Sequence, residues 1–245
     1  MDWNDDAIVL SARKHGETSA IVTLLTRYHG RHLGLVRGGA GRRARGLYQP
    51  GNKLHATWRG RLADHLGAYS CEMTQAVAAN LLEDPLRLAA LSSACAVTEA
   101  ALPEREIHEP VYIGLEILLA ALGDDESNSW PTVYVKWELG LLQELGFGLD
   151  LSQCAVTGGT EELTHVSPKT GRAVCAGAAA PYRDKLLALP GFMISAGQIG
   201  EVDEIPVGLK LTGYFLDRHV FSQRRDPKPP DARNRFIDRL RRLNC

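Results

Sequence analysis

Short apolar runs separated by glycine-containing breaks fill the first 80 residues of the chain. In the run at residues 52–58, Leu54, Ala56 and Trp58 alternate with polar residues, as expected for a strand with one buried face. No strong helical pattern occurs among the runs, so they predict a closed or nearly closed five-stranded β-barrel. The OB-fold is the commonest barrel of this kind, and an SH3-like barrel is the alternative. The predicted strands cover residues 7–12, 19–26, 32–37, 52–58 and 66–73.

The hydrophobic period becomes helical from residue 84. Asp84 and Pro85 are typical of a helix start, with an N-cap acceptor followed by proline at the first helical position. Apolar residues then recur on one face of each predicted helix, and the width of these faces predicts a small bundle. Proline or glycine ends each of the first three helices. The predicted helices cover residues 84–102, 109–122, 130–145, 182–189, 207–221 and 231–243.

The helical pattern is interrupted at residues 150–180. Two short β-like runs there flank a turn at Pro168-Lys-Thr-Gly171, which predicts a β-hairpin. The sequence therefore predicts an α+β protein with a barrel over residues 1–80. A helical domain follows over residues 81–245, and residues 150–180 form an insert within it.

Charge is segregated along the chain, although the net charge is only −1. Residues 1–80 carry a net charge of +5, residues 81–215 a net charge of −11, and residues 216–245 a net charge of +5. Two basic ends around an acidic middle indicate that a surface for a polyanion, if present, is built from the ends. The alternative is a solvated surface with uneven charge.

The segment between the third and fourth predicted strands combines glycine with arginine. Arg42, Arg43 and Arg45 lie among four glycines, with no apolar residue to anchor them, so we expect a mobile, exposed loop. The spacing of Gly39, Gly41 and Ala44 matches a dinucleotide-binding fingerprint, but the glycines and proline that follow exclude the helix which that fingerprint needs. A flexible arginine loop on a barrel favours a clamp for a phosphate backbone.

Aromatic faces interleaved with cations are what a groove for single-stranded nucleic acid requires. Trp58 is in phase with the buried residues of its strand and is predicted to belong to the core. Residues 231–243 place five arginines around one apolar stripe, which favours either a second phosphate contact or a docked terminal helix. The candidate nucleic-acid-binding residues are Arg37, Arg42, Arg43, Arg45, Tyr48, Lys53, Arg59, Arg61, Arg233 and Arg235.

Short motifs along nearly the whole chain resemble those of one bacterial family, the RecO family of recombination mediators. Each motif is short, but their order and spacing together are specific. They include His15-Gly-Glu-Thr-Ser, Leu47-Tyr-Gln-Pro-Gly-Asn52, Trp137-Glu-Leu-Gly-Leu-Leu-Gln-Glu-Leu-Gly-Phe-Gly-Leu-Asp150, Cys154-Ala-Val-Thr-Gly158, Val166-Ser-Pro-Lys-Thr-Gly-Arg-Ala-Val174 and Leu211-Thr-Gly-Tyr-Phe.

This resemblance implies a layout and a function. The layout is an N-terminal OB-fold, a helical bundle and a zinc-ribbon-like insert. The function is non-enzymatic: binding of single- and double-stranded DNA, and annealing of complementary strands. The implied partners are RecR, the C-terminal tail of the single-stranded DNA-binding protein and, indirectly, RecA, which is loaded onto coated single strands. The implied location is the cytoplasm, in association with the nucleoid.

The insert departs from the family pattern at its metal site. In metal-binding members, two Cys-x-x-Cys pairs supply four thiolates to tetrahedral zinc. Here Thr157 follows Cys154 and Ala178 follows Cys175 at the positions of the second cysteines, and His165 has no fixed geometry as a third ligand. The sequence therefore predicts no metal and no other cofactor. We expect the hairpin to be held by the packing of Val156, Leu163, Val166 and Val174.

Other features of the sequence agree with the cytoplasmic location that the resemblance implies. The chain has no signal-peptide pattern, and its apolar runs fall far short of the roughly 18 residues of a membrane span. Five scattered cysteines favour a reducing cytoplasm over a disulfide framework. The alternative function is a barrel-plus-helix scaffold that binds proteins without binding DNA, because such barrels do both.

Overall fold

The computed structural model describes residues 1–62, 65–124, 126, 128–195, 197–224 and 227–243. The chain divides into two compact units. The first contains Met1–Gly123 and Pro230–Phe236, and the second contains Asp124–Pro229 and Ile237–Cys245. Strands and helices both occur in the described residues, which confirms the α+β class. Within the same residues, no helix is long and apolar enough to cross a membrane.

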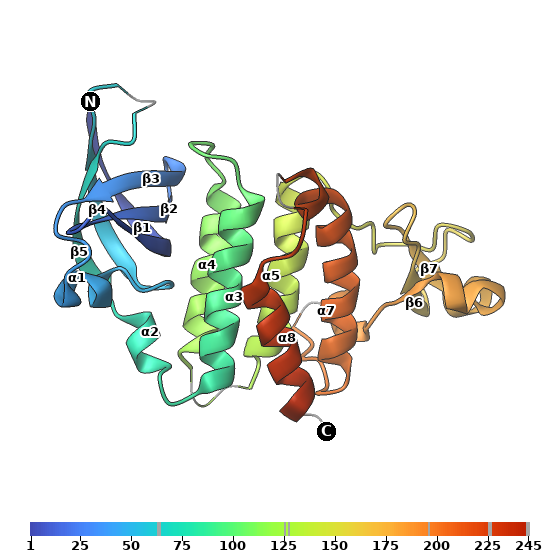
Figure 1. The fold of residues 1–245 in the computed structure, drawn as a ribbon. Coiled ribbons are helices and arrows are strands. Elements are labelled where there is room, and N and C mark those ends of the chain that lie inside the picture. Colours follow the sequence, from blue (N-terminus) through green and yellow to red (C-terminus); the bar gives the residue numbers. More distant parts are fainter. Residues whose placement is uncertain (63–64, 125, 127, 196, 225–226, 244–245) are drawn as a thin grey trace. The chain divides into compact units, whose positions relative to one another are not determined.

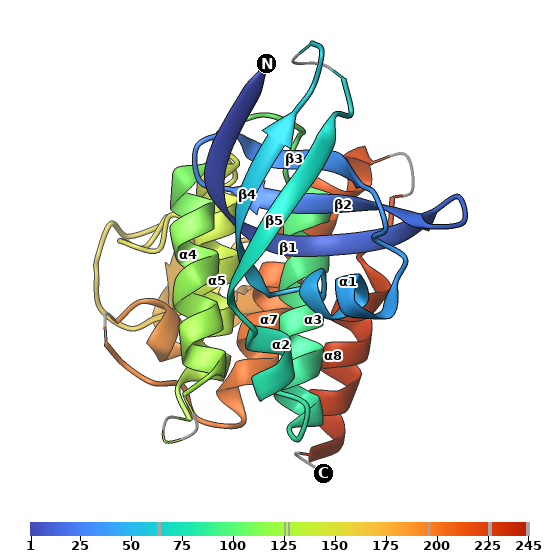
Figure 2. The same ribbon diagram turned by 90° about the vertical axis from the view of Figure 1, so that its left-hand side faces the viewer.

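Five strands of the first unit close into a barrel, as the sequence predicted (Figures 1 and 2). Their order around the barrel is β1-β2-β3-β5-β4, and β1 closes it by pairing antiparallel with β4. The contact between β3 and β5 is parallel, whereas the other pairs are antiparallel. The strands are β1 (Asp2–His15), β2 (Ser19–Thr26), β3 (Gly30–Val36), β4 (Lys53–Arg59) and β5 (Ala68–Gln75).

Strand β1 is much longer than its apolar run. Its C-terminal end continues the antiparallel pairing with β2, in which Arg13 pairs with Ile21 and Lys14 with Ala20. The prediction of a strand ending at residue 12 was wrong, because backbone hydrogen bonds hold the hairpin where its side chains are polar and solvated. This extension carries basic residues away from the barrel core.

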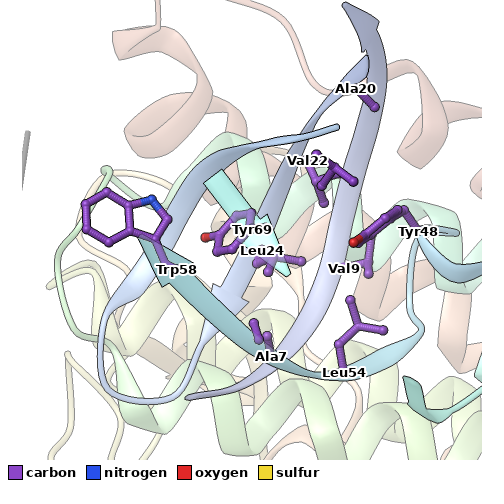
Figure 3. Packing of buried hydrophobic residues seen from close by; sticks show 11 residues of the cluster. Ala7, Val9, Ala20, Val22, Leu24, Tyr48, Leu54, Trp58 and Tyr69 are labelled. Carbon is purple, nitrogen blue, oxygen red and sulfur yellow. The ribbon is translucent and has the colours of Figure 1, made fainter. Parts of the chain in front are cut away.

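The barrel core is built around Trp58, which is 1% exposed. Its ring lies next to those of His32 and Trp3, with centroids 5.1 and 5.8 Å away, and it belongs to the same buried cluster as Leu24 and Tyr69 (Figure 3). The indole N–H donates to the carbonyl of Leu66 at 3.0 Å, so the one polar atom of the ring is satisfied. The alternation of residues 52–58 therefore identified a core tryptophan correctly.

The helix start at Asp84 also forms as predicted. The Asp84 carboxylate accepts hydrogen bonds from the backbone N–H groups of Leu86 and Arg87, at 2.9 and 3.0 Å. Such a cap stabilises a helix by about 1 kcal/mol. The helices of the first unit that follow the barrel are α2 (Val77–Asn80), α3 (Pro85–Ala101) and α4 (Glu109–Leu122).

Polar contacts fasten the barrel to α3. The hydroxyl groups of Ser11 and Thr23 both donate to the Glu99 carboxylate, at 2.9 and 3.0 Å. The Arg31 side chain donates to the carbonyl of Leu102 at 2.7 Å, just after the helix ends. The barrel and α3 therefore belong to one packed unit, and the predicted domain boundary at residue 80 stays a prediction.

The second unit contains α5 (Trp130–Glu144), α6 (Ala176–Ala179), α7 (Glu204–Phe215) and part of α8 (Asp231–Leu243). Helices α5 and α7 pack together, and the Thr212 hydroxyl donates to the buried Glu138 carboxylate between them. The prediction of a helix at residues 182–189 was wrong. A 3₁₀ turn at Ala180–Lys185 leads there into a short strand, whose Leu187 pairs with Val166.

The predicted hairpin insert is present as a small antiparallel sheet of order β7-β6-β8 (Figure 1). Its strands are β6 (Leu163–Val166), β7 (Ala173–Cys175) and β8 (Leu187–Ala188). Leu163, Val166 and Val174 are buried, as expected for packing residues. Val156 is 71% exposed, so it does not hold the insert; it lies in a turn whose backbone is fixed by hydrogen bonds instead.

Candidate nucleic-acid interface

The glycine- and arginine-containing segment forms a short helix, α1 (Arg42–Leu47), between β3 and β4 (Figure 2). The N–H of Tyr48 donates to the carbonyl of Ala44 at 3.0 Å, and the Asn52 side chain donates to the carbonyls of Gly46 and Leu47, at 2.9 and 3.2 Å. The expectation of a loop was wrong, as was the exclusion of a helix directly after Gly41, whereas the mobility of the segment stays a prediction. The apolar anchor lies immediately after the glycines.

That anchor is Tyr48, a predicted site residue. Its ring is 5% exposed and packs in the barrel core beside Val9 and Leu54 (Figure 3). Burial raises the pKa of its phenol well above the ordinary value, with a smaller contribution from Cys71. The structure therefore corrects its assignment: Tyr48 positions α1 and has no free face on which a base could stack.

The arginines of α1 face solvent. Arg42, Arg43 and Arg45 are exposed, as is Arg37 directly after β3. In the part of the chain that the structure describes, none of the four forms an ion pair with a carboxylate. Their guanidinium groups are thus available to an anionic ligand. Arginine forms bidentate hydrogen bonds with phosphate in a planar geometry that suits this role.

Two hollows flank α1, and each is more basic than acidic. The first, of about 800 Å³, is bordered by Arg13, Lys14 and Arg45, with one carboxylate from Glu17. Arg13 and Lys14 come from the β1–β2 hairpin, and the sequence analysis missed both. The signal that could have found them was the pair of basic residues directly after the first predicted strand, in the break before the second.

The second hollow, of about 1090 Å³, also borders α1. Arg37, Arg42 and Arg43 border it, with one carboxylate from Glu72. Exposed Met73 of β5 also contributes to its wall. The two hollows thus have different cations, and together they collect five of the predicted site residues: the buried Tyr48 and the arginines at 37, 42, 43 and 45.

Three other predicted residues of the barrel lie elsewhere. Lys53 is paired with Glu116 of α4, so its charge is already compensated. Arg59 and Arg61 are exposed, but Arg59 is the last residue of β4, roughly 20 Å along the strand from Lys53, and Arg61 follows it. Neither borders the hollows beside α1. These residues therefore do not form one surface with α1.

The two predicted arginines of α8 differ from each other. Arg233 is 4% exposed and so offers no free guanidinium to a phosphate, which corrects its assignment. Arg233 is buried because helical spacing places it on the same face of α8 as the buried residues Phe236 and Leu240. Arg235 is exposed.

An aromatic group near the start of β1 was also missed. The Trp3 ring stacks on His29, with centroids 4.1 Å apart, and the Asp5 carboxylate lies 2.9 Å from Nδ1 of His29. Beside them the Tyr28 ring is 55% exposed, and the Arg27 guanidinium lies 5.3 Å from its centroid. An exposed ring is a suitable platform for a base. The Arg27 guanidinium, however, is paired with the Glu109 carboxylate at 2.8 Å, so its charge is already compensated.

The cysteines of the insert do not fit a zinc site. Cys154 and Cys175 are adjacent, but Thr157 provides a neutral hydroxyl 3.7 Å from the Cys175 sulfur, and Ala178 provides no ligand atom. Zinc prefers thiolate, imidazole or carboxylate ligands. Among the described residues, no cluster of three or more such side chains occurs.

Comparison with known proteins identifies the chain's relatives. The family model described as "Recombination protein O N terminal" matches residues 1–76, and "Recombination protein O C terminal" matches residues 82–227. A DNA repair protein RecO from Rhodospirillum centenum is 54% identical over 246 residues, covering 100% of this chain and 96% of that protein. One from Rhodospirillum rubrum is 48% identical, covering 100% and 98%. One from Phenylobacterium zucineum is 49% identical and covers 98% of both.

Proposed function

Because the chain belongs to the RecO family of DNA repair and recombination proteins, we propose that it is a mediator which acts by binding and needs no catalytic step. It binds single- and double-stranded DNA and anneals complementary strands. Together with RecR, it helps to load RecA onto single strands coated by the single-stranded DNA-binding protein, whose C-terminal tail it engages. Its proposed location is the cytoplasm, at the nucleoid.

The observation that carries the proposal is the exposed, unpaired cations around α1. Six cations and two carboxylates border the two hollows, so the local charge is strongly positive although the chain is nearly neutral. Contacts with phosphate supply most of the affinity of sequence-independent DNA binding. A mediator that acts on any damaged sequence needs this kind of contact.

The barrel topology supports the proposed OB-fold. Five strands close in the order β1-β2-β3-β5-β4, and α1 fills the connection between β3 and β4. In OB-folds, nucleic acid is bound on the face of strands 2 and 3 and by the loops between strands 1 and 2 and between strands 4 and 5. The basic β1–β2 hairpin with Arg13 and Lys14 corresponds to the first of these loops. We propose the barrel of residues 1–80 as the DNA-binding domain, and residues 81–245, with a zinc-ribbon-like insert at 150–180, as the helical domain.

The two hollows also suit the annealing of strands. Bringing two strands together brings two lines of phosphate charge together, and their repulsion must be screened. The different cations of the two hollows provide separate contacts for two backbones without any base contact. The bases then remain free to pair with each other.

Titration of labelled DNA by fluorescence anisotropy tests the proposal. We expect the purified chain to bind single strands and duplex with an affinity that falls steeply as salt is raised. Mixing two complementary strands, one carrying a donor and the other an acceptor fluorophore, measures annealing in the same samples. A chain that binds neither form of DNA at low salt would instead be a protein-interaction scaffold, and the proposal would be wrong.

A further inference from the structure

Two cysteines of the insert are in direct contact. Cys154 lies at the start of a tight turn, and Cys175 ends β7. Their Sγ atoms are 3.3 Å apart, and the backbone N–H of Cys175 donates to the Cys154 sulfur at 3.2 Å. Both are free thiols. A disulfide bond of about 2.05 Å would need a sulfur displacement of only about 1.2 Å.

The backbone around the pair holds the sulfur atoms in this position. The N–H of Cys154 donates to the carbonyl of Gly159 at 2.7 Å, and the N–H of Gly158 donates back to the carbonyl of Cys154 at 2.9 Å. The next residue, Ala155, donates to the carbonyl of Ala173 in β7 at 2.8 Å. The turn is therefore already joined to β7 by backbone hydrogen bonds, which hold the two cysteines side by side.

The surroundings of the two thiols favour reaction. Burial raises the pKa of Cys154, but hydrogen bonds from the Thr157 hydroxyl and from backbone N–H groups outweigh it and lower the pKa to about 6. At neutral pH this cysteine is then largely a thiolate, the nucleophilic form. Cys175 is only half-buried, so a small oxidant can reach it. Elsewhere in the chain, burial raises the pKa of Cys71 to about 11 and of Cys95 to about 12, which keeps both protonated.

We propose that Cys154 and Cys175 are a redox-sensitive pair that forms an intramolecular disulfide when the protein meets a peroxide. Hydrogen peroxide oxidises the Cys175 thiol to a sulfenic acid, and one water leaves. The Cys154 thiolate then attacks the Cys175 sulfur and expels hydroxide, which takes up a proton to give a second water. In total, two thiols and one peroxide give one disulfide and two waters, and a thiol reductant reverses the change.

Mass spectrometry of the full-length protein tests the pair. The protein is purified with a reductant, freed of it, and treated with hydrogen peroxide at neutral pH. We expect the intact mass to fall by that of two hydrogen atoms, and a non-reducing peptide map to link the Cys154 and Cys175 peptides. Dithiothreitol should restore the original mass.

Variants separate the proposed pair from the other cysteines. Cys71→Ser should form the disulfide as the natural chain does. Cys154→Ser should leave a sulfenic acid on Cys175 that a dimedone probe captures. The proposal would be overturned by a linkage between other cysteines, by direct oxidation of Cys175 to a sulfinic acid in the natural chain, or by bound zinc that protects both thiols.

Discussion

Replacing Arg42, Arg43 and Arg45 together with alanine should weaken DNA binding and make it less dependent on salt. The three side chains are half of the cations that border the hollows beside α1. If the whole surface neutralises about five phosphates of a single strand, the slope of log affinity against log salt is roughly −3.5, since each contact contributes about −0.7. The triple variant loses up to three contacts, so its slope should flatten by about 2.

These slopes give a large difference in a simple titration. Raising the salt from about 50 to about 200 mM should weaken binding by the natural chain about a hundredfold, and by the variant less than about tenfold. The loss of affinity should be nearly the same for every sequence, because phosphate contacts read no bases. The fold should survive, because all three side chains are exposed.

Fluorescence anisotropy at several salt concentrations measures both quantities, and thermal unfolding checks the fold. A matched control is the triple variant Arg183→Ala, Lys185→Ala and Lys210→Ala, which removes three exposed cations outside the barrel. It changes the net charge equally and should keep the natural slope. Two results would refute the reasoning: a variant of α1 with unchanged affinity and slope, or a control variant that loses as much.

Three further predictions follow from other parts of the structure. Replacing Arg13 and Lys14 with alanine should flatten the salt slope by about 1.4 without affecting the thermal midpoint, and an unchanged slope would exclude the hairpin from the interface. Elemental analysis of the purified protein should find no stoichiometric zinc, because Cys154 and Cys175 lack two partner ligands; one zinc per chain, with unfolding on chelation, would show that the site was misinterpreted. Burial, with a smaller effect of a nearby arginine, lowers the pKa of His32 in the folded chain to about 4. As the pH drops from 6.5 to 4, the imidazole is therefore protonated in the unfolded chain before it is protonated in the folded chain, and the free energy of unfolding falls. The loss is at most about 3 kcal/mol, and urea unfolding should show it for the natural chain but not for His32→Asn, whereas equal losses in both would assign it to other groups.

Local patterns predicted the parts of the fold that depend on neighbouring residues. The alternation around Trp58 identified a strand and its buried face, and Asp84 with the following proline located a helix start to the residue. Both signals arise from geometry within a few residues, the pleat of a strand and the free N–H groups of a helix end. Neither requires knowledge of what the element packs against.

The predictions that were wrong or missing at the candidate interface concern residues whose position depends on tertiary contacts. Glycines suggested a mobile loop, but Tyr48 inserts into the barrel and fixes α1 from outside the glycine-containing segment. Arg233 is basic and lies in a strongly polar helix, yet the face it occupies is buried. Arg13 and Lys14 join the site only because the pairing of β1 with β2 continues past the predicted end of the strand. No pattern within these segments specifies such contacts.

Mapping where DNA touches the protein tests the central claim most directly. Single-stranded DNA that carries photoreactive thymine analogues is irradiated in complex with the full-length chain, and the crosslinked peptides are identified by mass spectrometry. The account predicts crosslinks concentrated in the β1–β2 hairpin around Arg13 and in residues 37–49, which contain α1. Crosslinks confined to α8, or to the far end of β4 around Arg59, would contradict it.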